Sequence, residues 1–367
     1  MSYRICTIYV LLLSTLCYPA LSVADDAPPV ATELSYSIES VKNFSGGISR
    51  GSATLGAALL DVSFDSAANG WWPGGTLFIE GLLDHGRDPS GAFIGDMQTA
   101  SNIADGNRTR LQQLWYEQKL GESLSLLVGL HDLNSEFDVS EYGSLFLNSS
   151  FGIAPDISAN AAGVSIFPQA GWALRLDFHP FDHLSLHGAV YDGDPTTRAV
   201  RSSEGTMKIV EAIWSSDTQA YKLGGWQHSG SKTAPDGRVF GSDGGLYAVV
   251  DQSLGGGYGV FVQLGYAQQG RNDIGNYVGL GLHVEGSVLG RGGDELGIAL
   301  ARAGFSDVYR RVNSSSRAET VVELTYHLQL LSWLSLHPDL QWIQHPGGDP
   351  TLSAASVGLL RASITLP

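Results

Sequence analysis

The strongest constraint on the fold is a two-residue alternation of apolar and polar side chains that runs through residues 319–367. From residue 322 to 330 the even positions are apolar or aromatic, and the odd positions are polar. Successive side chains of a β-strand point to opposite faces, so this segment has one apolar and one polar face. The pattern returns in residues 334–342 and 352–366. Strands of about ten residues exceed the usual five or six, and they are typical of a barrel with lipid outside and water inside.

The beginning of the chain predicts export from the cytoplasm. Arg4 supplies a positive charge, residues 5–21 are mostly apolar, and small residues precede a cleavage site after Ala24. We therefore expect a signal peptide over residues 1–24 and one β-barrel domain over residues 25–367. A retained membrane anchor is the alternative, which the short apolar run and its proline disfavour.

Composition favours an exported barrel over a helical membrane protein. Both cysteines, Cys6 and Cys17, lie in the predicted signal peptide, so no disulfide is expected. Hydrophobic residues make up 43% of the chain, yet beyond residue 24 no apolar run reaches the eighteen residues of a transmembrane helix. The net charge of −16 argues against nucleic acid as a partner. The acidity serves either loop solubility or contact with a cation-bridged lipid surface.

Further alternating segments indicate the size of the barrel. Tyr258 and Tyr266 share one face with the apolar residues between them, about 26 Å apart along an extended strand. An outer-membrane barrel needs an apolar band about 25 Å tall with an aromatic girdle at each rim. Similar segments give about sixteen strands, an even number that leaves an aqueous channel. The predicted fold class is all-β, a transmembrane antiparallel β-barrel.

Two long irregular segments interrupt the strands. The sequence predicts a polar loop over residues 84–107 and the longest irregular segment over residues 134–167. A loop as long as the second is usually functional in a compact structure. In a water-filled barrel its natural position is inside, so we expect this long loop to fold into the lumen and narrow it.

Several motifs, in order along the chain, are similar to those of one known family. They are LWYEQ at 114–118, DLNSEF at 132–137, LFLNSSFG at 145–152, VYDGDP at 190–195, ELTY at 323–326, HPDLQWI at 337–343 and PGG at 346–348. Together they resemble the carbohydrate-selective outer-membrane porins of the OprB type, from about Asn43 on. Barrels of this kind usually end in an aromatic residue that the assembly machinery recognises. The sequence ITLP at 364–367 lacks one, which we expect to affect assembly rather than fold.

The resemblance implies passive diffusion of small carbohydrates across the outer membrane of a Gram-negative bacterium, with no cofactor. The partners it implies are outer-membrane lipid, mono- or short oligosaccharides as transported solutes, and the barrel-assembly machinery. It fixes neither the sugar nor the choice between a monomer and a homotrimer. A general, non-selective porin is the alternative within the same class.

Alternation also predicts which side chains line the wall of the lumen. A sugar presents hydroxyls at its edges and a flat C–H face, so a selective channel is expected to offer charged groups, amides and aromatic rings. Opposed acids and bases across a narrow pore would orient polar solutes, whereas the alternative is that they only solvate the wall and pair with one another. The candidates from parity are Glu80, Arg175, Asp177, Glu323, His327, Asp339 and Arg361.

Two further groups complete the predicted pathway. Arg110, Trp115 and Glu117 are assigned to one face of the strand over residues 108–119. If that face borders the lumen, Trp115 can stack on a sugar ring; otherwise Trp115 belongs to the lipid-facing girdle. The long loop supplies a constriction set that either lines the channel or fastens the loop to the wall, namely Asn134, Phe137, Asn148 and Phe151.

Catalytic and metal-binding motifs lack the required context. Residues 47–51, GISRG, match a hydrolase motif that needs a strand entering a helix, but here Ser49 lies between two predicted strands. The ten histidines show no zinc-binding helical spacing with a glutamate, so no metal site is expected. An outer-membrane barrel enzyme is the less favoured alternative, and we expect no enzymatic activity.

Overall fold

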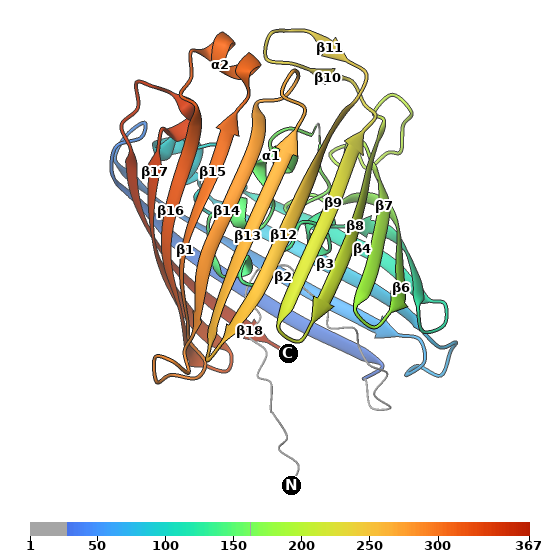
Figure 1. Cartoon of the computed structure of the whole chain (residues 1–367). Helices are drawn as coiled ribbons and strands as arrows, with labels where there is room; N and C mark the ends of the chain where they lie inside the picture. Colours follow the sequence, from blue (N-terminus) through green and yellow to red (C-terminus); the bar gives the residue numbers. More distant parts are fainter. Residues whose placement is uncertain (1–27, 162) are drawn as a thin grey trace.

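The structure is a computed structural model that describes residues 28–161 and 163–367 (Figure 1). The predicted signal peptide and both cysteines lie outside the described residues. Sixteen strands form one closed barrel in which β1 pairs with β18, and all neighbouring strands shown in register are antiparallel. This confirms the predicted all-β barrel and its strand number.

The barrel strands have the bounds β1 (Val30–Ser45), β2 (Gly51–Asp65), β3 (Gly75–Gly86), β4 (Arg108–Lys119), β5 (Leu124–His131), β6 (Gly171–Phe181), β7 (Leu184–Asp192), β8 (Thr206–Ser216), β9 (Gln219–His228), β12 (Asp243–Gly255), β13 (Tyr258–Ala267), β14 (Ile274–Glu285), β15 (Glu295–Phe305), β16 (Ala318–Leu331), β17 (Leu334–Gln344) and β18 (Ala355–Leu366). A separate hairpin joins β10 (Lys232–Thr233) to β11 (Val239–Phe240). The α-helices in the described residues are α1 (Pro155–Ser158) and α2 (Asp307–Asn313). None of the helices in the described part is long and apolar enough to cross a bilayer.

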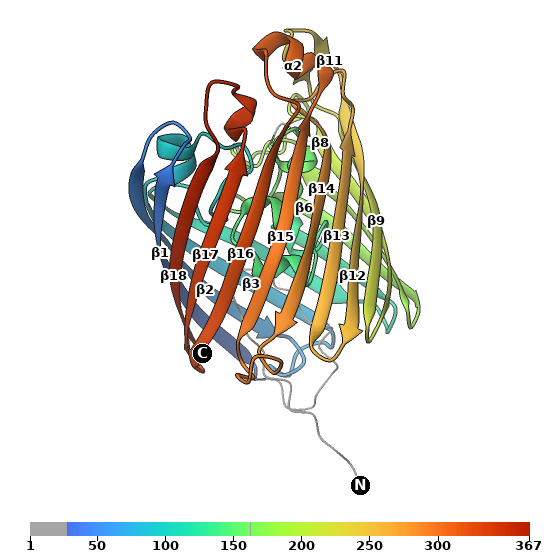
Figure 2. The same cartoon turned by 60° about the vertical axis from the view of Figure 1, so that its left-hand side comes forward.

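The two ends of the barrel differ in their connections. Short turns such as residues 182–183 and 332–333 gather at the end where the C-terminus lies, at the bottom of Figure 1. Longer connections gather at the opposite end, which carries α2 and the β10–β11 hairpin (Figures 1 and 2). Outer-membrane barrels have short periplasmic turns and longer external loops. We call these ends the short-turn end and the long-loop end.

Alternation along the strands separates an outer apolar surface from an inner polar one. On β13, Tyr258 and Tyr266 are 42% and 50% exposed, whereas Phe261 and Gln263 between them are buried on the inner side. The same period governs β16, where Leu324 is exposed and Glu323 is buried. The two-residue rhythm in the sequence therefore corresponds to the inside and outside of the barrel.

Two segments from the long-loop end fold into the barrel. The second inner segment, residues 132–170, includes α1 and is the long loop that the sequence predicts to enter the lumen. The first inner segment, residues 87–107, was predicted only as a polar loop, yet Ala100 and Ile103 are buried in the interior. The two segments bind each other, since the Asn102 N–H donates to the Leu147 carbonyl at 2.8 Å.

Glycines on the inner face of the barrel give the second inner segment room to dock. A Cβ atom at Gly265 of β13 would lie 1.8 Å from the Asp156 carboxylate, and one at Gly297 of β15 would lie 2.6 Å from the Phe146 ring. A side chain at either position would therefore displace the inner segment. Absence of a side chain permits this close approach.

A bulge in β4 changes which residues share a face. Opposite β3 the register shifts by one residue, and both Gln112 and Gln113 are buried. Strict alternation would place Arg110 on the opposite face from Trp115 and Glu117. The extra residue brings all three onto the inner face, because a bulge inserts one residue into one strand of a pair.

Candidate functional site

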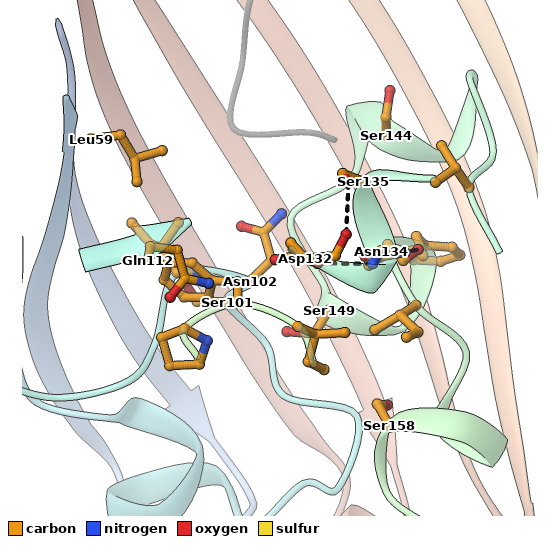
Figure 3. A pocket seen from close by; sticks show the side chains of 18 of the residues that line it. Leu59, Ser101, Asn102, Gln112, Asp132, Asn134, Ser135, Ser144, Ser149 and Ser158 are labelled. Atoms are coloured by element: carbon orange, nitrogen blue, oxygen red, sulfur yellow. Dashed lines mark hydrogen bonds between the residues drawn. The ribbon is translucent and has the colours of Figure 1, made fainter. Parts of the chain in front are cut away.

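The candidate site is a cavity of about 410 Å³ between the two inner segments and the inner face of β1–β4 (Figure 3). Polar residues of both inner segments project into it, including Ser101, Asn102, Asn134 and Ser149. Inward-facing residues of the barrel strands complete its lining. The residues lining it from the strands are Glu33, Ser35, Leu59, Asp61, Glu80, Gln112, Gln113 and Thr365.

The lining combines the two kinds of group that a sugar requires. Serine hydroxyls and side-chain amides can exchange hydrogen bonds with the edges of a sugar ring. Half-buried Phe167 adds apolar surface for its C–H face, and the buried rings of Phe146 and Phe151 pack behind it with centroids 4.9 Å apart. The cavity therefore suits a neutral polyhydroxylated solute better than a purely apolar one.

Asp132 marks the point where β5 gives way to the second inner segment. Its carboxylate accepts a hydrogen bond from the Asn134 N–H at 2.8 Å, and its own N–H donates to Gln113 at 3.1 Å. Burial raises the pKa of Asp132 to about 7, and nearby donors such as the Asn134 N–H oppose this rise. The β-strand wall and the inner segment are thus joined by a titratable group that lines the cavity.

Three carboxylates lie side by side on the wall of the cavity. Glu33 of β1 is the register partner of Asp61 of β2, and Asp61 is the partner of Glu80 of β3. All three line the cavity, and we call them the acidic row. Gln113 of β4 donates a hydrogen bond to Glu80 at 3.2 Å.

Carboxylates elsewhere on the wall bind the inner segments instead. On β16, Glu323 accepts hydrogen bonds from the backbone N–H groups of Leu147 and Asn148 at 2.6 and 3.2 Å. Glu319 likewise accepts from the first inner segment, at Met97 and Gln98, each at 2.9 Å. We call the inner face of β12–β17 the covered wall, because inner segments pack against it.

Asp251 of β12 holds the second inner segment in the same way. It accepts a hydrogen bond from the Ser140 hydroxyl at 2.6 Å and from the Glu141 N–H at 3.1 Å. The side chain of Asn148 then donates to Gln341 of β17 at 3.1 Å. These bonds fix the path of the segment across the lumen and thereby set one side of the cavity.

A buried ion cluster anchors the start of the second inner segment. Arg175 of β6 pairs with Glu136 at 2.6 Å, with Asp177 at 2.7 Å and with Glu117 at 3.3 Å. Burial raises the pKa of Glu136 to about 7, although the neighbouring guanidinium lowers it. A second buried pair joins Arg361 of β18 to Glu39 of β1 at 2.7 Å.

The predicted lumen residues all lie inside the barrel, but few of them border the cavity. Glu80, Asn134 and Phe151 line it. The remaining predicted residues are held in ion pairs, hydrogen bonds or packing away from its lining, namely Arg110, Trp115, Glu117, Phe137, Asn148, Arg175, Asp177, Glu323, His327, Asp339 and Arg361. Trp115 stacks on Phe78 with ring centroids 4.9 Å apart, and Phe137 is fully buried.

Several lining residues were missed from the sequence. The first inner segment contributes Met97, Thr99 and Ser101, although it was predicted only as a polar loop. Apolar residues such as Ile94 and Ile103 within that loop were the available signal, since an external loop has little reason to carry them. Among the described residues, no group of three or more His, Cys, Asp or Glu side chains is arranged to hold a metal ion.

Comparison with known proteins identifies several similar chains. The family described as "Carbohydrate-selective porin, OprB family" matches residues 49–366. Porin B of Pseudomonas aeruginosa is 24% identical over 326 residues, which cover 72% of this chain and 71% of that protein.

Solved structures share the fold. The high-pH structure of Pseudomonas putida OprB has a TM-score of 0.84 at 20% identity, covering 92% of this chain and 94% of that chain. The low-pH structure of the same protein has a TM-score of 0.61 at 18% identity, covering 92% and 93%. The outer-membrane channel DcaP of Acinetobacter baumannii has a TM-score of 0.61 at 9% identity, covering 92% and 97%.

Proposed function

Because this chain belongs to the OprB family of carbohydrate-selective porins, we propose that it lets small carbohydrates diffuse passively across the outer membrane of a Gram-negative bacterium. The short-turn end is then periplasmic and the long-loop end faces the outside. The protein is a channel, and its solutes move down their own gradient.

The observation that carries this proposal is the cavity between the two inner segments. Its lining of hydroxyls, amides, carboxylates and phenylalanine rings matches the edges and face of a sugar. A volume of about 410 Å³ falls in the lower part of the range that holds small molecules, roughly 300–1,000 Å³. We infer that monosaccharides and short oligosaccharides are the solutes.

The predicted lumen residues divide into two roles in this proposal. Glu80 and Asn134, which border the cavity, contact the passing sugar, and the fully buried Phe151 supports the lining from behind. Arg175 and Glu323 act indirectly, because they hold the second inner segment at the position that shapes the cavity. Loss of a residue in the second group would widen the channel rather than remove a contact.

Recordings from planar bilayers containing the mature protein test the proposal. We expect stable pores whose current falls as glucose, maltose or sucrose is added. Pores indifferent to every sugar would leave only a general, non-selective porin. A protein that forms no pores would overturn the proposal altogether.

A pair of glutamine variants sharpens the experiment. Gln112 lines the cavity, and the Gln112→Leu variant is expected to weaken current block by sugar because a hydrogen-bonding amide is lost. Gln227 lies exposed on the outer side of β9, so Gln227→Leu serves as the matched control and should leave the block unchanged. Equal block in both variants would remove the cavity from the sugar pathway.

A further inference from the structure

The acidic row is an arrangement that proteins ordinarily avoid. Glu33, Asp61 and Glu80 occupy directly opposite positions on three adjacent strands. Like charges directly opposite each other in a sheet are destabilising. Elsewhere in the barrel, Glu39 is directly opposite Arg361 and pairs with it at 2.7 Å. The acidic row therefore lacks an opposite basic residue, although the same sheet provides one for Glu39 only a few residues away.

Among the described residues, no basic side chain borders the cavity. Its described lining contains four carboxylates, from the acidic row and Asp132, and no lysine, arginine or histidine. Two guanidinium groups behind the lining are already engaged in ion pairs. Arg361 pairs with Glu39 and also donates to the lining residue Asn102 at 2.7 Å, and Arg110 pairs with Asp105 at 3.3 Å. The sequence left open whether acids and bases oppose each other across the pore or only solvate the wall and pair with one another, and at this cavity only acids are present.

One further detail of the cavity indicates that it is arranged for a ligand. Gln112, only 1% exposed, lies close enough to Asp132 to lower its pKa, yet neither polar atom of its amide meets hydrogen-bond geometry with a protein partner.

We propose that the acidic row makes the neck of this channel prefer cations, so that positively charged carbohydrates such as amino sugars pass more readily than acidic sugars. The inference rests on the proposed function and adds a charge preference to it. Charges of one sign within low-dielectric walls focus their field along a cleft and raise the local concentration of counter-ions. Rings of acidic side chains select cations in other channels by the same physics.

Ion selectivity measures this preference directly. With a potassium chloride gradient across a planar bilayer, the reversal potential of the wild-type pore is expected to report a potassium-to-chloride permeability ratio above 1. In the triple variant Glu33→Gln, Asp61→Asn, Glu80→Gln we expect that ratio to fall by about threefold or more. Glu122→Gln, at the exposed turn between β4 and β5, is the control and should keep the wild-type ratio.

The second measurement compares the entry rates of carbohydrates that differ in charge. Liposome swelling with glucosamine, glucose and glucuronate is expected to be fastest for glucosamine and slowest for glucuronate. The triple variant should bring the three rates together. The single variant Asp61→Asn should give an intermediate result, which tests the row even if the triple variant folds poorly.

The outcomes separate this inference from the proposed function. A wild-type pore that passes or binds neutral sugar but has no charge preference would overturn the inference alone. A triple variant that conducts with the wild-type permeability ratio would also overturn it. A wild-type pore that sugar neither blocks nor crosses would instead overturn the function on which the inference rests.

Discussion

The covered wall and the acidic row place carboxylates on the same inner face of one sheet, but they use them differently. On the covered wall, Glu323 and Asp251 each accept hydrogen bonds from backbone N–H groups of the second inner segment. In the acidic row, Asp61 and Glu80 border the cavity and face each other. Side-chain parity is identical in the two regions. What differs is whether an inner segment lies against the strand.

The comparison shows that an inward position is necessary but insufficient for a role in the pathway. A carboxylate on the covered wall compensates buried N–H donors, which cost free energy when left unpaired. A carboxylate in the acidic row does not compensate a backbone N–H group of an inner segment, so it stays available to a solute. Substitutions should therefore affect stability on the covered side and selectivity on the open side.

The largest effect is expected at the anchor of the second inner segment. Arg175→Met would leave Glu117, Glu136 and Asp177 without their shared cation. Removing one partner of a buried ion pair typically costs about 3–5 kcal/mol. Urea titration of the refolded variant should show a loss of that size, and bilayer recordings should show a larger, noisier conductance. A wild-type unfolding midpoint would contradict the anchoring role.

A matched pair of glutamates tests the comparison most directly. Glu323→Ala removes the acceptor for two buried N–H groups, so we expect a loss of roughly 3 kcal/mol. Glu80→Gln keeps the shape of a side chain that accepts a hydrogen bond from the wall residue Gln113 rather than from an inner segment, and should change stability by less than about 1 kcal/mol. Equal destabilisation in the two variants, measured by the same urea titration, would erase the distinction between the regions.

Asp156 of α1 packs against the covered wall but is an exception to this use of carboxylates. Its contribution to stability should depend on pH. Its carboxylate is fully buried against Gly265 and receives no hydrogen bond from another residue. Burial raises its pKa to about 7. The unfolded chain releases this proton at lower pH than the folded protein does, so stability falls as pH rises from about 4 through 7.

For that group we expect a loss of roughly 2 kcal/mol between pH 5 and pH 8. Thermal unfolding followed by circular dichroism at both pH values provides the measurement. Asp156→Asn, which cannot ionise, should flatten the dependence by that amount. If the variant and the wild type show the same pH slope, other acids must account for it.

The smallest effect should have the opposite sign. Asp61→Asn removes the central charge of the acidic row and with it the repulsion from its cross-strand neighbours. We expect a gain of about 0.5–1 kcal/mol in unfolding free energy, together with the change in ion selectivity described above. A clear loss of stability would mean that the row holds the barrel together.

Local periodicity accounted for most of the barrel. The segment 108–119 was predicted as a strand with the bounds that β4 has, and the two-tyrosine strand predicted over 258–268 matches β13 except for its last residue. The bulge at Gln112 escaped prediction because one extra residue leaves no local signature. The first inner segment escaped because its few apolar residues lie within a polar loop.

Pathway residues were harder to predict than strands for a physical reason. Alternation tells which way Glu323 and Glu80 point, and both are indeed on the inner side. Whether a segment covers them depends on contacts between distant parts of the chain, such as the bond between Leu147 and Glu323 across 176 residues. A single sequence carries no direct record of those contacts.

The long-range bonds also imply an order of events when the protein is made. Both inner segments precede residue 171, but the carboxylates that secure them lie on β12 and β16. Closing such long stretches of chain costs conformational entropy that the final bonds must offset. The narrowest part of the channel therefore takes shape only after the C-terminal strands have joined. An assembly intermediate stalled before β16 would form a wide pore without selectivity.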